Sequence, residues 1–223
     1  MEEWYDDLIT HSAHARDCFL SDYTPFTSFL ATLEGTVLDI GGGIGIVRHY
    51  LPDGIRYITV EPSLSWLSME WTPLAEYFPC LCSEPSFVRG VGEYLPFASN
   101  SVNAILAFWS LNHVAEPQSV FREVWRVLQP GGIFLVVLED MTPNLWDALG
   151  HLPIMRRWLS WRHVWGKRFL RFPSLLRNRR VQLQSDHIHI KESDIQRWTL
   201  GKLELVQRAW VSGYLMLEFR KVK

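Results

Sequence analysis

The sequence predicts an α/β fold, in which a mostly parallel sheet is covered by helices on both faces and ends in an antiparallel hairpin. Five short apolar runs alternate with helical stretches, which is the pattern of βαβ units with right-handed crossovers. A glycine-rich turn directly follows the first run, as in open parallel sheets. Two further runs at the carboxyl end are joined by a tight turn, which makes them antiparallel. In order, the runs span residues 36–40, 56–60, 87–89, 104–109, 133–138, 203–210 and 214–222.

Helical segments are expected before and between these strands. A first stretch runs from Glu2 to about Phe19, and a second runs from Pro25 to Leu33 with Thr24 as its N-cap. The glycine-rich turn continues as a helix to about residue 50. Apolar side chains then recur at helical spacing from Pro117 to Leu128, and the sequence Gln-Pro-Gly-Gly at 129–132 stops that helix.

Composition points to one folded domain in a reducing compartment. The chain has 223 residues, of which 48% are hydrophobic and 21% charged, and this excludes a disordered protein. The longest apolar run, Ile133–Leu138, is far shorter than a transmembrane segment, and the acidic start does not resemble a secretory signal. We therefore expect a cytoplasmic protein without a transmembrane segment. Its cysteines, Cys18, Cys80 and Cys82, are expected to be reduced and mostly buried, and no metal site is predicted.

A basic, tryptophan-rich segment interrupts an otherwise acidic chain. Residues 151–185 hold nine Lys and Arg side chains and no Asp or Glu, although the whole chain has a net charge of −2. Apolar residues from Ile154 to Phe169 recur at helical spacing, including Trp158, Trp161 and Trp165. This segment is either a helix packed on the core with solvated arginines, or a surface for an anionic or aromatic small molecule, an anionic membrane or RNA. A small molecule is favoured, and no stable nucleic-acid partner is expected.

The turn after the first strand predicts a nucleoside site. Asp39 is the second-last residue of the first strand, and glycines within 41–45 let the backbone approach a ligand closely. Glu61 follows the second strand, where a carboxylate can accept both hydroxyl hydrogens of a ribose. The nicotinamide fingerprint fails because Ile46 stands where it requires glycine, and no Walker phosphate loop is present. The ligand is therefore expected to be a nucleoside without a diphosphate.

Four motifs in order resemble those of the class I S-adenosylmethionine-dependent methyltransferases, in the group that includes ubiquinone-biosynthesis-type and other small-molecule enzymes. They are VLDIGGGIG at 37–45, VEPS at 60–63, GVGEYLPFASNSVNAILAFWSLNHV at 90–114 and FREVWRVLQPGG at 121–132. The resemblance covers about residues 36–140. It implies a Rossmann-like seven-stranded sheet, S-adenosylmethionine as cofactor and a methyltransferase of the EC 2.1.1 class.

The resemblance also implies a division of the single domain 1–223. Residues 1–34 would form amino-terminal lid helices, 35–140 the cofactor-binding core, 141–200 a basic, tryptophan-rich cap insertion and 201–223 the terminal hairpin. By the same resemblance, Asp39 and Gly41 lie against the methionine moiety and Glu61 holds the ribose. The complete implied cofactor set is Tyr5, Asp39, Gly41, Gly42, Gly43, Gly45, Glu61, Pro62, Gly92, Glu93 and Ser110.

The sequence departs from the family at the adenine. Val91 stands where the family usually has an acidic residue that accepts a hydrogen bond from the adenine amino group. Either the Glu93 side chain or the backbone of Gly92 and Glu93 is expected to take over this contact.

Methyl transfer requires alignment of donor and acceptor and, for some acceptors, removal of a proton. His113, just after the fourth strand, is the candidate base because histidine titrates in the useful range. His187, His189 and Asp140 are weaker candidates, and His11 and His14 lie on the opening helix. The predicted activity is methyl transfer to a small organic acceptor, and anionic and aromatic molecules are the candidate acceptors. The alternatives are an RNA-nucleoside methyltransferase and a non-catalytic S-adenosylmethionine-binding protein.

Overall fold

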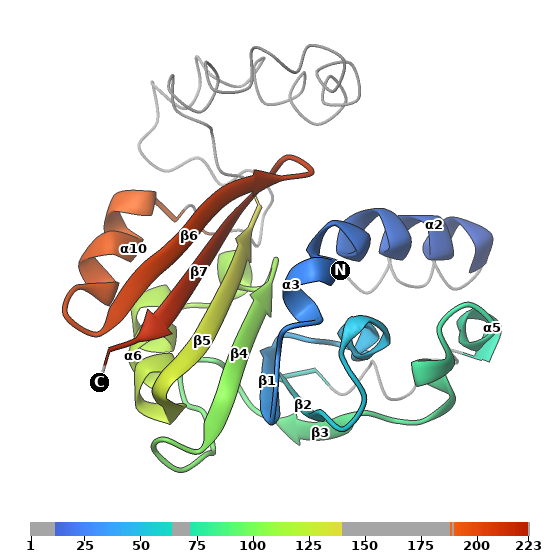
Figure 1. The fold of residues 1–223 in the computed structure, drawn as a ribbon, viewed down its shortest axis with the longest axis horizontal. Coiled ribbons are helices and arrows are strands. Elements are labelled where there is room, and N and C mark those ends of the chain that lie inside the picture. The colour runs from blue at the N-terminus through green and yellow to red at the C-terminus, as the bar shows by residue number, and fades with distance from the viewer. Residues whose placement is uncertain (1–11, 64–71, 140–187, 189, 223) are drawn as a thin grey trace.

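The computed structural model describes residues 12–63, 72–139, 188 and 190–222 (Figure 1). Within these residues, seven strands form one sheet in the order β3-β2-β1-β4-β5-β7-β6. The strands are β1 (Thr36–Ile40), β2 (Arg56–Glu61), β3 (Ser86–Arg89), β4 (Val102–Phe108), β5 (Leu128–Leu138), β6 (Leu203–Val211) and β7 (Tyr214–Lys221).

The strand directions confirm the predicted mostly parallel sheet. Strands β1 to β5 pair with one another in parallel, with Leu38 beside Ile58 and Ile105, for example. Strand β7 then inserts antiparallel between β5 and β6, with Val136 opposite Leu217. The chain therefore ends in the antiparallel hairpin that the sequence predicts.

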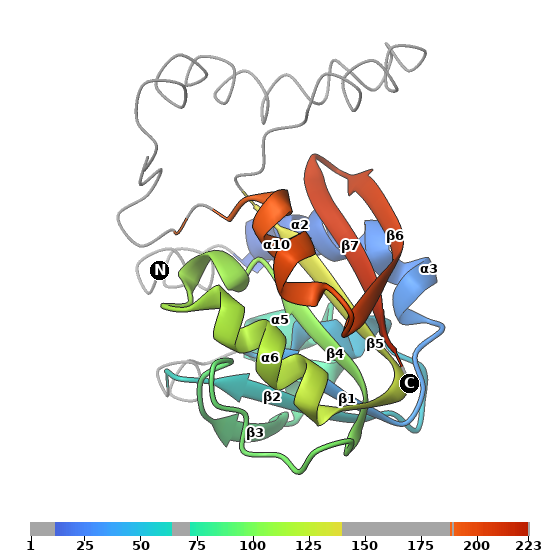
Figure 2. The ribbon, with the colours of Figure 1, turned by 90° about the vertical axis from the view of Figure 1, so that its left-hand side faces the viewer.

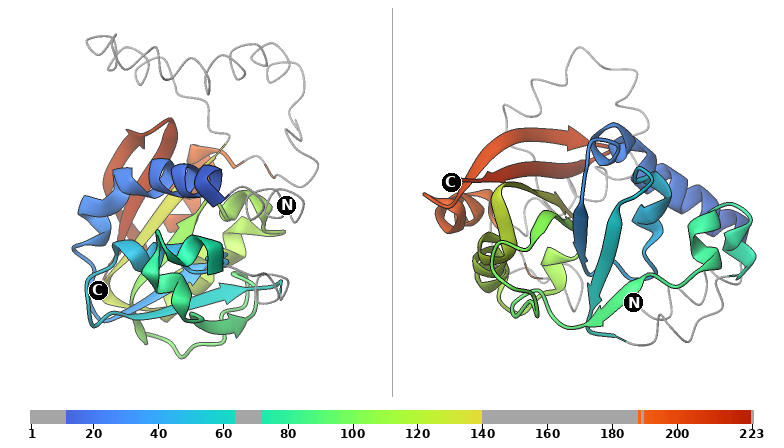
Figure 3. Two further views of the ribbon diagram at one scale, coloured as in Figure 1. Left: turned by 90° about the vertical axis from the view of Figure 1, so that its right-hand side faces the viewer. Right: turned by 60° about the horizontal axis from the view of Figure 1, so that its bottom comes forward.

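Helices cover both faces of the sheet. Helices α6 and α10 lie on one face (Figure 2), and α2 and α3 lie on the other side of the molecule (Figure 3). The helical elements are α2 (Ser12–Tyr23), η1 (Thr24–Phe26), α3 (Thr27–Leu30), η2 (Ile46–Tyr50), α5 (Thr72–Ala75), η3 (Pro79–Cys82), η4 (Leu111–His113), α6 (Pro117–Val127) and α10 (Glu192–Thr199), where η marks a 3₁₀ helix.

Alternation along the central strand explains the two hydrophobic cores. Ile105 of β4 packs in one cluster with Val124 of α6 and Ile195 of α10. Its neighbour Leu106 packs on the opposite face with Leu30 of α3. Successive side chains of a strand point to opposite faces, so β4 is apolar and buried from Ala104 to Phe108.

Several local predictions differ from the structure. Thr24 is not a helix N-cap, because it lies inside η1, and its carbonyl accepts a hydrogen bond from the Thr27 hydroxyl at 2.8 Å. The opening helix runs on to Tyr23 rather than ending near Phe19. The expectation that the cysteines are mostly buried is wrong, because Cys18 and Cys80 are half-buried and Cys82 is exposed.

Part of the expected cap belongs to the layered core. Helix α10 contacts α6, and the Trp198 ring lies 5.6 Å from that of Phe121. The basic segment 151–185 lies outside the described residues, as do Tyr5, His11, Asp140, His187 and His189, and so does the side chain of His14. Among the helices that the structure describes, none is long and apolar enough to cross a membrane.

Candidate functional site

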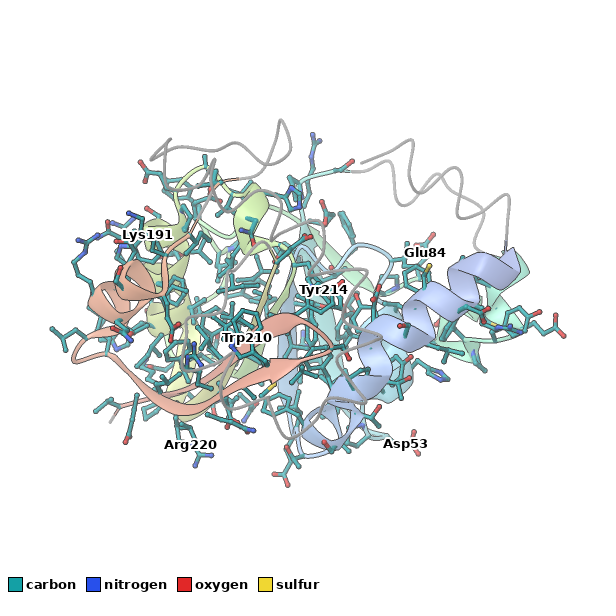
Figure 4. The ribbon with its side chains drawn as sticks, turned by 90° about the horizontal axis from the view of Figure 1, so that it is seen from above. Asp53, Glu84, Lys191, Trp210, Tyr214 and Arg220 are labelled. Atoms are coloured by element: carbon teal, nitrogen blue, oxygen red, sulfur yellow. The ribbon has the colours of Figure 1, made fainter. Side chains whose placement is uncertain are left out.

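The candidate site lies at the edge of the sheet where the parallel strands end. Because β1 to β5 are parallel, their carboxyl ends meet at this edge. The backbone amide of Gly41, directly after β1, donates a hydrogen bond to the carbonyl of Val60 in β2 at 2.8 Å. Figure 4 views the molecule from above in Figure 1, the side on which β4 and β5 end.

Two glycines let the turn after β1 pack closely against the loop after β4 and against side chains of β1 and β2. Gly41 has a φ of +72°, and a Cβ added there would lie 2.6 Å from the Cβ of Ser110. A Cβ on Gly42 would lie 2.6 Å from Cγ of Asp39 and 2.8 Å from Oγ1 of Thr59. Only glycine fits at these contact distances, so the turn and the loop after β4 form one surface.

Asp39 lies beneath this turn in a buried polar pair. Its side chain is 1% exposed, and its Oδ2 accepts a hydrogen bond from the Tyr57 hydroxyl at 2.7 Å. Asp39 Oδ1 and Thr59 Oγ1 are buried without hydrogen-bond partners among the described residues. Burial raises the pKa of Asp39 to about 7; the Tyr57 hydrogen bond opposes this rise, and the negative charge of Glu61 adds to it.

Sequence reasoning missed Tyr57 because the run 56–60 was interpreted only as a strand. The available signal was a tyrosine at an expected buried position of that strand, since a buried tyrosine hydroxyl needs a hydrogen-bond partner.

Glu61 lies where the sequence predicts. It is the last residue of β2, its side chain is 8% exposed, and its Oε1 accepts a hydrogen bond from the backbone amide of Ser63 at 3.3 Å. The adjacent Pro62 is exposed. The Glu61 carboxylate therefore lies at the end of β2, and the glycine-rich turn follows the neighbouring strand, β1.

Glu93 has a structural contact that the sequence analysis did not predict. Its Oε1 accepts hydrogen bonds from the backbone amides of Ala115 at 2.9 Å and Glu116 at 3.2 Å, just before α6. This carboxylate oxygen therefore anchors the loop that leads into α6. The Val91 side chain is 39% exposed, and a Cβ added to Gly92 would lie 2.9 Å from Ile40.

His113 faces a second carboxylate that the sequence analysis did not name. Nε2 of His113, in η4 after β4, lies 3.7 Å from Oε1 of Glu139, the residue directly after β5. The preceding Asn112 is held by Ile188, whose amide donates to the Asn112 carbonyl at 2.6 Å. The Asn112 side-chain amide donates in return to the Ile188 carbonyl at 3.0 Å. The signal for Glu139 was its place at the end of the fifth strand, where only its neighbour Asp140 was considered.

An acidic group interacts with Glu139, and an aromatic cluster forms around the residue after β4. Burial, together with the negative charge of Glu139, raises the pKa of Asp22 in α2 to about 6. The ring of Trp109, the residue after β4, lies 5.1 Å from that of Tyr23 and 5.2 Å from that of Tyr214 (labelled in Figure 4). Trp109 has a φ of +53°, and its Nε1 is buried without a hydrogen-bond partner among the described residues. The sequence did not bring these residues together because they come from α2, β4 and β7.

The described residues fit a nucleoside cofactor. A close-approach glycine turn, a carboxylate at the end of β2 and buried polar atoms without protein partners meet at one edge; these atoms include Asp39 Oδ1 and Ser110 Oγ. Where side chains are described, no group of three or more His, Cys, Asp or Glu residues is arranged to hold a metal ion.

Comparison with known proteins identifies relatives over this region. Residues 38–136 match the family model described as a methyltransferase domain. An uncharacterized methyltransferase of Mycolicibacterium gilvum is 36% identical over 108 residues, which are 48% of this chain and 40% of that protein. Another, from Mycobacteroides abscessus, is 31% identical over 136 residues, which are 60% of this chain and 50% of that protein. The chain thus spans half or less of the length of these relatives.

Solved structures share the fold across nearly the whole chain. One is a chain from the complex between the Haloferax volcanii Trm112 methyltransferase activator and a methyltransferase, with a TM-score of 0.63, 15% identity, and coverage of 96% of this chain and 95% of that one. An S-adenosylmethionine-dependent methyltransferase from Aquifex aeolicus has a TM-score of 0.56 and 13% identity, with 91% and 92% covered. At these identities the likeness shows the fold.

Proposed function

We propose that this chain, which carries a class I S-adenosylmethionine-dependent methyltransferase domain, catalyses methyl transfer to a small organic acceptor. The observation that carries the proposal is the edge of the sheet where Gly41, Glu61 and Ser110 meet within the matched family region. The proposal includes membership of the group with ubiquinone-biosynthesis-type enzymes and a small organic molecule as the methyl acceptor.

The glycine turn and Glu61 would hold the cofactor. The Glu61 carboxylate would accept the ribose hydroxyl hydrogens, and the turn from Gly41 to Gly45 would offer backbone amides to the methionine moiety. Asp39 supports the turn from below through its packing under Gly42. S-adenosylmethionine, when bound, supplies an electrophilic methyl group on a sulfonium.

The adenine contact falls to the backbone of Gly92 and Glu93 in this proposal. One Glu93 carboxylate oxygen already accepts two backbone amides before α6. Gly92, packed against Ile40 of β1, brings the backbone close to the turn. Adenine can be recognised by backbone groups because its edge carries both a donor and an acceptor.

His113 and the aromatic cluster would face the acceptor. His113 lies in η4 after β4, and its backbone amide donates a hydrogen bond at 3.1 Å to the carbonyl of Ser110, the residue that contacts the glycine turn. The rings of Trp109 and Tyr214, which pack against each other after β4, would offer the acceptor an apolar wall. Small organic molecules bind in such mostly apolar sites with a few placed polar groups. The free thiols fit a reducing compartment, and we place the reaction in the cytoplasm.

Two measurements test this proposal. Isothermal titration calorimetry with S-adenosylmethionine and S-adenosylhomocysteine should show binding to the wild type and to a control variant, Glu204→Ala on the exposed edge of the sheet. Radiolabel from methyl-labelled S-adenosylmethionine should enter a small-molecule extract of cells rather than bulk RNA from the same cells. Label in the RNA fraction would support the RNA-nucleoside alternative, and cofactor binding without transfer to either fraction would support a non-catalytic protein.

A further inference from the structure

The pair formed by His113 and Glu139 joins two strands at the edge that holds the candidate site. His113 follows β4 and Glu139 follows β5, and these strands pair in register up to Phe108 and Val137. Hydrogen bonds between Asn112 and Ile188 hold the turn that carries His113. The Nε2 and Oε1 atoms are 3.7 Å apart, and the two side chains are 22% and 27% exposed.

The burial of the imidazole selects one of its nitrogens. Nδ1 of His113 is buried from solvent. Nε2 is therefore the nitrogen that faces Glu139 and can exchange a proton with another molecule. A proton taken up at Nε2 creates an imidazolium at a distance where a carboxylate stabilises it.

We propose that Glu139 is a positioning residue for His113, so that the pair removes a proton from an acceptor whose methylated atom is an oxygen or a nitrogen bearing hydrogen. This inference rests on the proposed methyl transfer. In that step the acceptor forms a bond to the methyl carbon, the carbon–sulfur bond breaks with its electron pair going to sulfur, and the acceptor proton moves to His113 Nε2. The sulfonium becomes a neutral sulfide, and the positive charge ends on the imidazolium beside Glu139. The balance needs no further reactant.

Asp22 of α2, in the described part of the chain, is a further charged group within electrostatic range of Glu139. Its carboxylate adds negative charge near Glu139 and so favours the same imidazolium. Trp109, the residue directly after β4, packs its ring against that of Tyr214 at 5.2 Å.

Histidine-ring NMR tests the proposal without a known acceptor. The protein is labelled with ¹⁵N-histidine, the His113 signal is assigned from the spectrum of His113→Gln, and its titration is followed from pH 5 to 9. In the ligand-free protein, Glu139→Gln should move the His113 midpoint to lower pH, by a threefold to about tenfold change in the protonation equilibrium. Glu139→Asp, which keeps the charge, should restore most of the shift. Glu204→Gln, which removes a carboxylate from exposed β6, should leave the midpoint in place.

A second arm asks whether the pair faces the methyl donor. The positive sulfonium of S-adenosylmethionine should move the His113 midpoint to lower pH than in the complex with neutral S-adenosylhomocysteine. Equal midpoints in wild type and Glu139→Gln, or equal midpoints in the two complexes, would overturn the proposal. If neither ligand binds, the proposed function fails instead, and the ligand-free comparison still decides whether Glu139 controls His113.

Discussion

Replacing Tyr57 by phenylalanine removes one hydroxyl from the interior and leaves Asp39 without its hydrogen-bond donor. Asp39 is 1% exposed, Tyr57 is 6% exposed, and the bond between them is 2.7 Å long. A hydrogen bond to an ionised group contributes about 1.5–3 kcal/mol, and one to a neutral group about 0.5–1.5 kcal/mol. The loss on Tyr57→Phe should therefore depend on whether Asp39 is ionised.

The direction follows from the raised pKa of Asp39. Its value of about 7 exceeds the ordinary value of 3.8 because burial disfavours the carboxylate. This group therefore contributes stability that is fully present below about pH 4 and is lost as the pH rises through about 7, with a total on the order of 4 kcal/mol. The Tyr57 hydroxyl lowers the pKa of Asp39, so removing it raises that pKa further and deepens the loss at high pH.

Urea unfolding at pH 5 and pH 8.5 measures this effect. Tyr57→Phe should lower the free energy of unfolding by about 1 kcal/mol more at pH 8.5 than at pH 5. In an Asp39→Asn background the difference between the two pH values should vanish. Tyr94→Phe, which changes a tyrosine that is 72% exposed, serves as the control and should alter neither value. Equal destabilisation by Tyr57→Phe at the two pH values would refute the charge-dependent account.

Three further predictions test the candidate site. Glu61→Ala should weaken S-adenosylmethionine binding about tenfold by calorimetry, because a carboxylate with two hydroxyl hydrogen bonds is lost; equal binding of the 2′-deoxy analogue and the parent cofactor by the wild type would contradict this role. Gly41→Ala should cost more stability than Gly201→Ala in urea, because both have a φ near +70° but only at Gly41 does a Cβ meet a neighbour, Ser110. Gly41→Ala should also weaken cofactor binding, and equal losses for the two variants would argue against the contact. Glu93→Ala should lower the free energy of unfolding by about 1–3 kcal/mol, because two backbone amides before α6 lose their acceptor. Glu93→Gln keeps an acceptor oxygen and should retain most of the wild-type stability. An Ala variant as stable as the wild type would show that this anchor is unimportant.

The sequence predicted the elements whose pattern is local. The apolar run in β4 and the helical spacing in α6 reflect burial, and burial is repeated along each element. Most observed boundaries differ from the predicted ones by only one or two residues, whereas β5 starts earlier than predicted, at Leu128. The start of the second helical segment was harder to predict. Thr24 is a residue type that often caps helices, and yet it lies inside a 3₁₀ helix. A short helix is fixed by what it packs against as much as by its own residues.

Some residues of the candidate site were predictable from the sequence, and others were not. Gly41, Glu61 and His113 each follow a predicted strand, so the sequence alone placed them at one edge, since parallel strands end together. Tyr57, Asp22 and Glu139 needed the tertiary structure. Tyr57 reaches Asp39 across two paired strands, and Asp22 comes from a helix far from Glu139 in sequence. Sequence patterns determine which face or edge of an element a residue occupies, whereas the distance between two side chains on different elements is set only when the sheet and its helices pack together.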